Sequence, residues 1–104
     1  DAGLIVLVSF ISPFKSERRM ARDLVGEHEF IEIFVDTPIE ICMQRDPKGL
    51  YIKAQAGEIA NFTGISSPYE LPENAEITVK TANRTPEDCA AEIVGYLRKQ
   101  GIVP

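Results

Sequence analysis

The stretch that decides the fold is "LIVLVSFISPFKSERRMARDLVGE", residues 4–27, where an unbroken apolar run gives way to serine, proline and charge. Residues 4–10 are rich in β-branched side chains, which is typical of a strand covered on both faces in a parallel sheet. Residues 16–27 place Met20 and Leu24 four positions apart, which predicts a helix with one apolar face. Its outward, solvated face is predicted to carry Arg18, Arg19 and Arg22.

The strand-then-helix pattern recurs twice further along the chain. Residues 30–36 predict a second strand, after which Pro38 can occupy the first position of a helix. Residues 76–81 predict a third strand, and Thr85 followed by Pro86 is typical of a capped helix start. Alternating strands and helices predict an α/β fold, in which right-handed crossovers connect parallel strands.

Composition restricts the classes of function. A chain of 104 residues with 44% hydrophobic content predicts one small domain or a piece of a larger one, and its start without methionine favours the second. The formal charge of -5 disfavours nucleic acid and anionic membranes as partners. Cys42 and Cys89 lack metal-ligand spacing, which predicts reduced thiols, no metal site and a cytoplasmic protein. The run "LIVLV" is far shorter than the roughly 20 residues of a membrane span.

In open α/β sheets the ligand crevice lies outside the carboxyl ends of the strands. Those ends here carry "SFISP", "DTP" and "TANRT". Ser12 is therefore expected in the region where such folds keep their chemistry. Ser12 before Pro13 equally fits the N-cap of the following helix, and the two roles are compatible.

Residues 45–73 form an unusually long connection, which we call the lid segment because long insertions in enzymes often close over ligands. A cation in such a segment contacts anions, and an aromatic ring offers a stacking face for a purine. The alternative is a surface excursion whose aromatic side chains pack into the core. The cations and aromatics concerned are Lys48, Lys53, Tyr51, Phe62 and Tyr69.

Several motifs in this order carry a resemblance: "LIVLVSFISPFKSERRMAR", "EIFVDTP", "RDPKGLY", "AGEI" and "NFTGI". Together they resemble the C-terminal part of adenylyl sulfate kinase, and the match covers essentially the whole chain. The resemblance implies a three-layer parallel sheet of the P-loop NTPase, nucleotide kinase-like type. Residues 1–104 would be the C-terminal portion of one such domain. The implied activity is transfer of the ATP γ-phosphoryl to the 3'-hydroxyl of adenylyl sulfate, with magnesium, in sulfate assimilation.

The resemblance also implies a substrate site. It places Ile11 and Ser12 at the adenylyl sulfate pocket, and Ser12 matches the position that becomes phosphorylated in some family members. Lys48 is similar to the lid lysine that approaches the substrate anion. Phe62 is similar to the aromatic that stacks on the substrate adenine, with Asn61 beside it. Direct in-line transfer is favoured over a covalent mechanism through Ser12.

The ATP site implied by the resemblance draws on the lid and on the last loop. Arg45 resembles the arginine that covers the ATP adenine, while Arg84 and Cys89 resemble the opposite wall. The implied partners are small-molecule nucleotides, a second copy of the chain in a homodimer, and sulfate adenylyltransferase by fusion or association.

Departures from the family pattern bear on activity. Where members commonly read "KGLYKKARAGEIKNFTGID", three lid cations are lost; the departures are Ile52, Gln55, Ala60 and Ser66. No G-x-x-x-x-G-K-[ST] motif occurs in the 104 residues, and the acidic and arginine-bearing substrate motif of the family is missing too. We therefore expect a fragment truncated before its P-loop and inactive on its own. Two alternatives stay open, another P-loop small-molecule kinase and a non-catalytic interaction module of the same fold.

Overall fold

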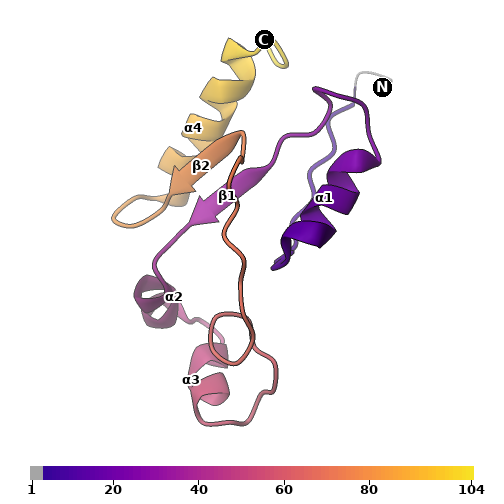
Figure 1. Ribbon diagram of the computed structural model, residues 1–104. Helices are drawn as coiled ribbons and strands as arrows, with labels where there is room; N and C mark the ends of the chain where they lie inside the picture. Colours follow the sequence, from indigo (N-terminus) through magenta and orange to yellow (C-terminus); the bar gives the residue numbers. More distant parts are fainter. Residues whose placement is uncertain (1–3) are drawn as a thin grey trace.

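The computed structural model describes residues 4–104, which form four helices and two strands among the described residues (Figure 1). β1 and β2 form a parallel pair in which Ile33 lies opposite Ile77 and Asp36 opposite Lys80. The parallel pairing confirms the α/β architecture and two of the predicted strands, each slightly shorter than expected. The elements are α1 (Lys15–Asp23), β1 (Ile33–Asp36), α2 (Ile39–Arg45), α3 (Leu50–Gln55), β2 (Ile77–Lys80) and α4 (Pro86–Lys99).

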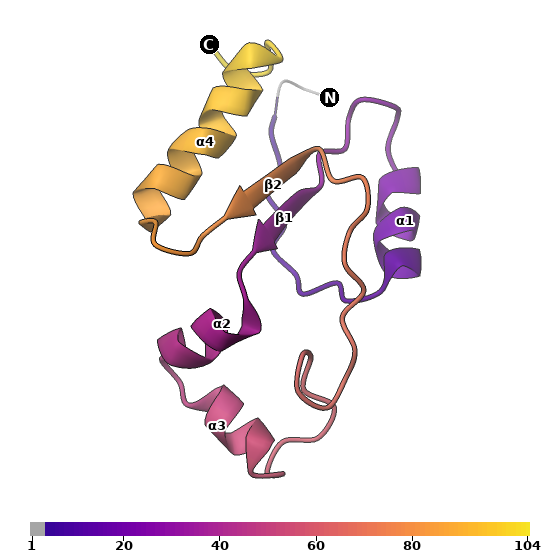
Figure 2. The ribbon, with the colours of Figure 1, turned by 60° about the vertical axis from the view of Figure 1, so that its left-hand side comes forward.

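The two helices that flank the strands lie on opposite sides of them. In both ribbon views α4 lies along one side of β2 and α1 lies on the other side of the pair (Figures 1 and 2). Along β2, Ile77 and Val79 are buried while Thr78 and Lys80 are exposed, the alternation of a strand with one covered face. This arrangement places α2, α3 and the lid segment beyond the carboxyl end of β1.

The start of α4 follows the sequence prediction. Thr85 is its N-cap, and the Thr85 side chain accepts a hydrogen bond from the Asp88 backbone N–H at 3.1 Å, with Pro86 in the first turn. Among residues 4–104, no helix is both long enough and apolar enough to cross a membrane.

The predicted strand at residues 4–10 is wrong. This segment is extended but pairs with neither β1 nor β2 in the described chain. Its side chains are largely exposed, up to 88% for Leu7. A strand exists only where a neighbour satisfies its N–H and C=O groups, so residues of high β-propensity are insufficient without a partner.

The predicted capping role of Ser12 and the predicted helix position of Pro38 are also wrong. α1 begins at Lys15 with Phe14 in the N-cap position, so Ser12 and Pro13 precede the helix and do not cap it. Ser12 instead adopts a left-handed backbone conformation with φ +44°. α2 has Pro38 at the N-cap, one position before the helix.

The faces of α1 differ from the prediction as well. Met20 and Leu24, expected to be covered, are 65% and 81% exposed. Arg22, expected in solvent, donates two hydrogen bonds to the Glu76 carboxylate at 2.8 and 2.9 Å, and Arg18 pairs with Glu32 at 3.2 Å. Arg19 is exposed, as predicted. No residue of α1 is buried. The helix is instead held by ion pairs to Glu32, just before β1, and to Glu76, just before β2.

Candidate functional site

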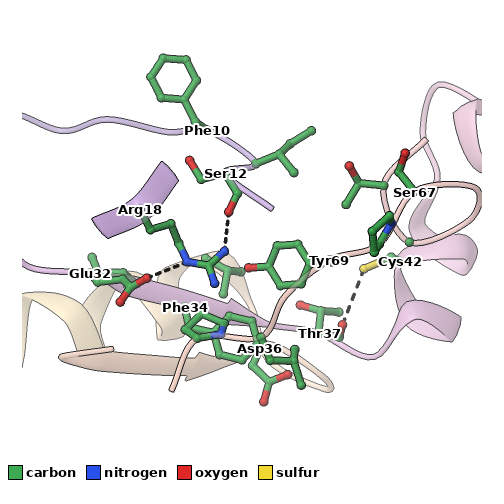
Figure 3. A pocket seen from close by; sticks show the side chains of 18 of the residues that line it. Phe10, Ser12, Arg18, Glu32, Phe34, Asp36, Thr37, Cys42, Ser67 and Tyr69 are labelled. Atoms are coloured by element: carbon green, nitrogen blue, oxygen red, sulfur yellow. Dashed lines mark hydrogen bonds and ion pairs between the residues drawn. The ribbon is translucent and has the colours of Figure 1, made fainter. Parts of the chain in front are cut away.

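A cavity of about 1550 Å³ opens beside β1, between the N-terminal segment, α1 and the returning half of the lid segment. Figure 3 shows part of its lining. Four of the five predicted substrate residues line it: Ile11, Ser12, Asn61 and Phe62. The structure therefore brings together two stretches of sequence that lie far apart in the chain.

Phe62 stands in a tight turn at the cavity wall. The Phe62 carbonyl accepts hydrogen bonds from the N–H groups of Ser66 and Ser67 at 2.8 and 3.0 Å, and the Phe62 N–H donates to Ser66 Oγ at 2.7 Å. Ser66, which the sequence marked only as a departure, thus stabilises this turn. The turn holds the Phe62 ring in place, half-buried, beside the cavity.

The Phe62 ring also contacts α3. It meets the Tyr51 ring edge-on, with centroids 4.9 Å apart and planes at 72°, a favourable aromatic geometry. Burial of the Tyr51 phenol, with Cys42 nearby, raises its pKa. Phe62 is therefore neither fully exposed nor part of the buried core, because one edge packs on Tyr51 while the side chain lines the cavity.

Lys48 is not among the residues that line the cavity. It is exposed and lies just before α3, where Gly49 has φ +67°. The Asp46 carboxylate accepts from the N–H groups of Leu50 and Tyr51 at 2.8 and 3.0 Å, and so caps α3. The position of Lys48 thus depends on a short, well-capped helix.

The predicted ATP residues lie apart from this cavity, near the carboxyl end of β2. Arg45 donates to the Thr81 hydroxyl and carbonyl, both at 3.0 Å. Arg84 donates to the Lys80 carbonyl at 3.1 Å and to the Glu92 carboxylate at 2.7 Å. Cys89 is half-buried in α4. Both guanidinium groups therefore lie at the end of the strand where the sequence predicted a site.

Sequence reasoning missed the contacts that join the strand ends and the lid. Thr37 and Thr81, which follow β1 and β2, share a hydrogen bond between their hydroxyl groups. A threonine after each of two paired parallel strands is a signal that could have indicated it. Arg18 and Glu70 were missed too, because their contacts are mostly with backbone atoms, which sequence patterns do not reveal.

The described residues offer no obvious ligand set for a metal. Within residues 4–104, no group of three or more His, Cys, Asp or Glu side chains is placed to hold an ion. Asp36 is the carboxylate at the carboxyl end of β1 and lines the cavity. A lone carboxylate does not make a magnesium site, so we assign no ligand to it.

Comparison with known proteins identifies the family. The family model described as adenylylsulphate kinase matches residues 1–80. The chain belongs to the adenylylsulphate kinase family. Membership confirms the resemblance carried by the sequence motifs.

Individual relatives agree. The bifunctional enzyme NodQ of Rhizobium tropici is 65% identical over 100 residues, which are 96% of this chain and 16% of that protein. The adenylyl-sulfate kinase of Marinobacter nauticus is 53% identical over 103 residues, 99% of this chain and 52% of that protein. The chain thus spans a small part of NodQ and about half of the kinase.

A solved structure supports the fold. The Mycobacterium tuberculosis APS kinase CysC, in complex with AMPPNP and APS, matches with a TM-score of 0.80 and 43% identity. The match covers 86% of this chain and 52% of that one. The predicted P-loop NTPase fold class is confirmed.

Proposed function

We propose that residues 1–104 are the C-terminal portion of an adenylyl sulfate kinase domain, with a lid at residues 45–73. In the full-length gene product this domain transfers the γ-phosphoryl of ATP to the 3'-hydroxyl of adenylyl sulfate. The observation that carries the proposal is that Ile11, Ser12, Asn61 and Phe62 line the same cavity. Family membership and a 43% identical relative solved with AMPPNP and APS support it.

The proposed substrate site uses few residue types. Phe62 offers its ring to the adenine, Asn61 a polar group beside it, and Ile11 an apolar wall. Ser12 lies at the same wall and directs a hydroxyl to the substrate. Lys48, just before α3, approaches the substrate anion when the lid closes over it.

The proposed ATP site lies near the carboxyl end of β2. Arg45 covers the adenine, and Arg84 and Cys89 form the opposite wall. Phosphoryl transfer requires positioning and charge stabilisation more than covalent catalysis, so a phosphorylated Ser12 would be a side product. Magnesium would neutralise charge on the ATP phosphates, and we place its site largely outside residues 1–104.

The setting of the enzyme is also a proposal. We place it in the cytoplasm, as a homodimer, fused to or associated with sulfate adenylyltransferase. NodQ of Rhizobium tropici supports a fusion, because it is described as a bifunctional enzyme and the match covers only 16% of it.

Calorimetric binding to the full-length gene product tests the substrate assignment. Adenylyl sulfate, shikimate and gluconate are each titrated into the protein in separate experiments. Shikimate and gluconate are substrates of other P-loop small-molecule kinases. The proposal predicts saturable binding of adenylyl sulfate alone. Binding of shikimate or gluconate in its place contradicts it, and absence of any binding favours an interaction module.

A further inference from the structure

The Arg18 side chain joins three separate parts of the chain. Its Nη1 donates to the Ser12 carbonyl at 2.5 Å, and its Nη2 donates to the Glu70 carbonyl at 2.6 Å. Its Nε pairs with the Glu32 carboxylate at 3.2 Å (Figure 3). The Arg18 and Glu32 side chains are only 12% and 18% exposed, and the bond to Ser12 is partly buried, whereas the bond to the Glu70 carbonyl is exposed. Each acceptor is met by a different nitrogen of the planar guanidinium, whereas an ammonium offers its donors from a single nitrogen.

The contacts of Arg18 belong to a larger junction. The Glu70 N–H donates to the Pro13 carbonyl at 2.7 Å, and the Glu70 carboxylate accepts from the Lys15 N–H at 2.6 Å. The Arg18 guanidinium also lies 5.7 Å from the centre of the Tyr69 ring. Residues 67–73, the return segment of the lid, are therefore bonded to residues 9–15, the Ser12 loop, at several points.

The backbone of Ser12, at the cavity wall, is in an unfavourable conformation. Serine at φ +44° occupies a region that is unfavourable for residues other than glycine and persists only when surrounding contacts hold it. The Arg18 hydrogen bond ends on the carbonyl of that same residue. The same guanidinium therefore holds the strained residue of the loop and the end of the lid segment.

We propose that Arg18 is a positioning residue that locks the Ser12 loop to the return segment of the lid, so that the two sides of the substrate cavity keep a fixed relation. The proposal rests on the proposed function where it concerns adenylyl sulfate. The coupling of the Ser12 loop to the return segment rests only on the observed contacts of Arg18. Because the ATP residues bond elsewhere, at Lys80, Thr81 and the start of α4, Arg18 acts on one substrate and not on the other.

Arg18→Gln and Arg18→Lys in the full-length gene product test the proposal, with Arg19→Gln as the matched control. Arg19 is the neighbouring arginine on α1 and is exposed. Hydrogen–deuterium exchange is followed in peptides spanning the Ser12 loop and the return segment. Arg18→Gln is expected to raise exchange in both segments together, whereas Arg19→Gln raises it in neither.

Steady-state kinetics add a readout that general destabilisation would not reproduce. Arg18→Gln should raise KM for adenylyl sulfate by about tenfold, the scale for loss of one charged hydrogen bond, while KM for ATP changes less than about twofold. Arg18→Lys retains the charge opposite Glu32, so it should preserve the fold. Its KM for adenylyl sulfate should nevertheless stay nearly as high as that of Arg18→Gln. Should Arg18→Gln fail to fold, Arg18→Lys supplies both readouts.

The outcomes separate this proposal from the proposed function. Unchanged exchange in either segment overturns the coupling, whatever the kinetics. Equal rises in KM for both substrates also overturn it, because the effect is then not specific to the Ser12 side. An unmutated protein without kinase activity counts against the proposed function alone, and the exchange experiment still decides the coupling.

Discussion

Replacing Phe62 by alanine in the full-length gene product separates two roles that an aromatic can play at the cavity wall. Stacking on a base contributes about 1–3 kcal/mol, so loss of the ring should weaken adenylyl sulfate binding by roughly 5-fold to 150-fold. The contact with Tyr51 is worth about 0.5–1.5 kcal/mol beyond the area it buries. Because Phe62 is half-buried, the stability loss should be well below the about 3–5 kcal/mol typical of a buried phenylalanine.

The assay combines chemical denaturation with calorimetric titration of adenylyl sulfate on the same preparation. Tyr51→Leu is the control, because it removes the ring that Phe62 meets but leaves Phe62 itself. It should lower stability by an amount similar to the ring contact and weaken binding by less than about threefold. A large stability loss in Phe62→Ala with affinity preserved would refute the stacking role. Equal loss of affinity in the two variants would also refute it.

Three further predictions concern other parts of the chain. Lys48→Ala should weaken adenylyl sulfate binding by about 1.5–3 kcal/mol, the scale of a charge-assisted hydrogen bond, and an unchanged affinity in calorimetry would remove Lys48 from the site. The 104-residue chain by itself should form no 3'-phosphoadenylyl sulfate from ATP and adenylyl sulfate, since it carries no phosphate-binding loop motif; chromatographic detection of ATP-dependent product would contradict this. The Arg22 guanidinium holds the pKa of Glu76 below its ordinary value of 4.5, so the stabilisation by this pair is complete above about pH 4.5 and is lost as the pH falls through the lowered pKa. Melting temperatures measured from pH 7 to pH 3 should therefore fall less for Glu76→Gln than for the unmutated protein, and parallel curves would refute it.

Local signals in the sequence were enough for part of the fold. The β-branched runs gave β1 and β2, and the Thr85–Pro86 start gave α4, because caps and alternation depend on neighbouring residues. Residues 4–10 have the same local character as those strands yet form none in the described chain. Pairing depends on a partner distant in sequence, which a local pattern cannot supply.

The orientation of α1 shows the same limit. The periodicity correctly predicted a helix, but it predicted the wrong side chains to be exposed. Met20 is exposed to solvent, and Arg22 is bonded to Glu76. Helical spacing tells which residues share a face and not what that face meets. The partner of Arg22 lies more than 50 positions away in the sequence.

The residues of the candidate site could be predicted from the sequence more readily than the hydrogen bonds that hold them in place. The motifs around Ser12 and Phe62 could be recognised, and both residues line one cavity. That Arg18 binds the Ser12 and Glu70 carbonyls could not be read, because every residue offers a backbone carbonyl and only the folded chain selects among them. The roles assigned to all the site residues remain predictions, namely those of Ile11, Ser12, Arg45, Lys48, Asn61, Phe62, Arg84 and Cys89.

Transfer of labelled phosphate tests the central claim most directly. The full-length gene product is incubated with magnesium, adenylyl sulfate and ATP labelled at the γ-phosphorus, and the nucleotides are separated. We expect the label in 3'-phosphoadenylyl sulfate, with loss of transfer when the 3'-hydroxyl of the acceptor is replaced by hydrogen. Label that never reaches adenylyl sulfate, or that reaches the 3'-deoxy acceptor equally well, would contradict the account.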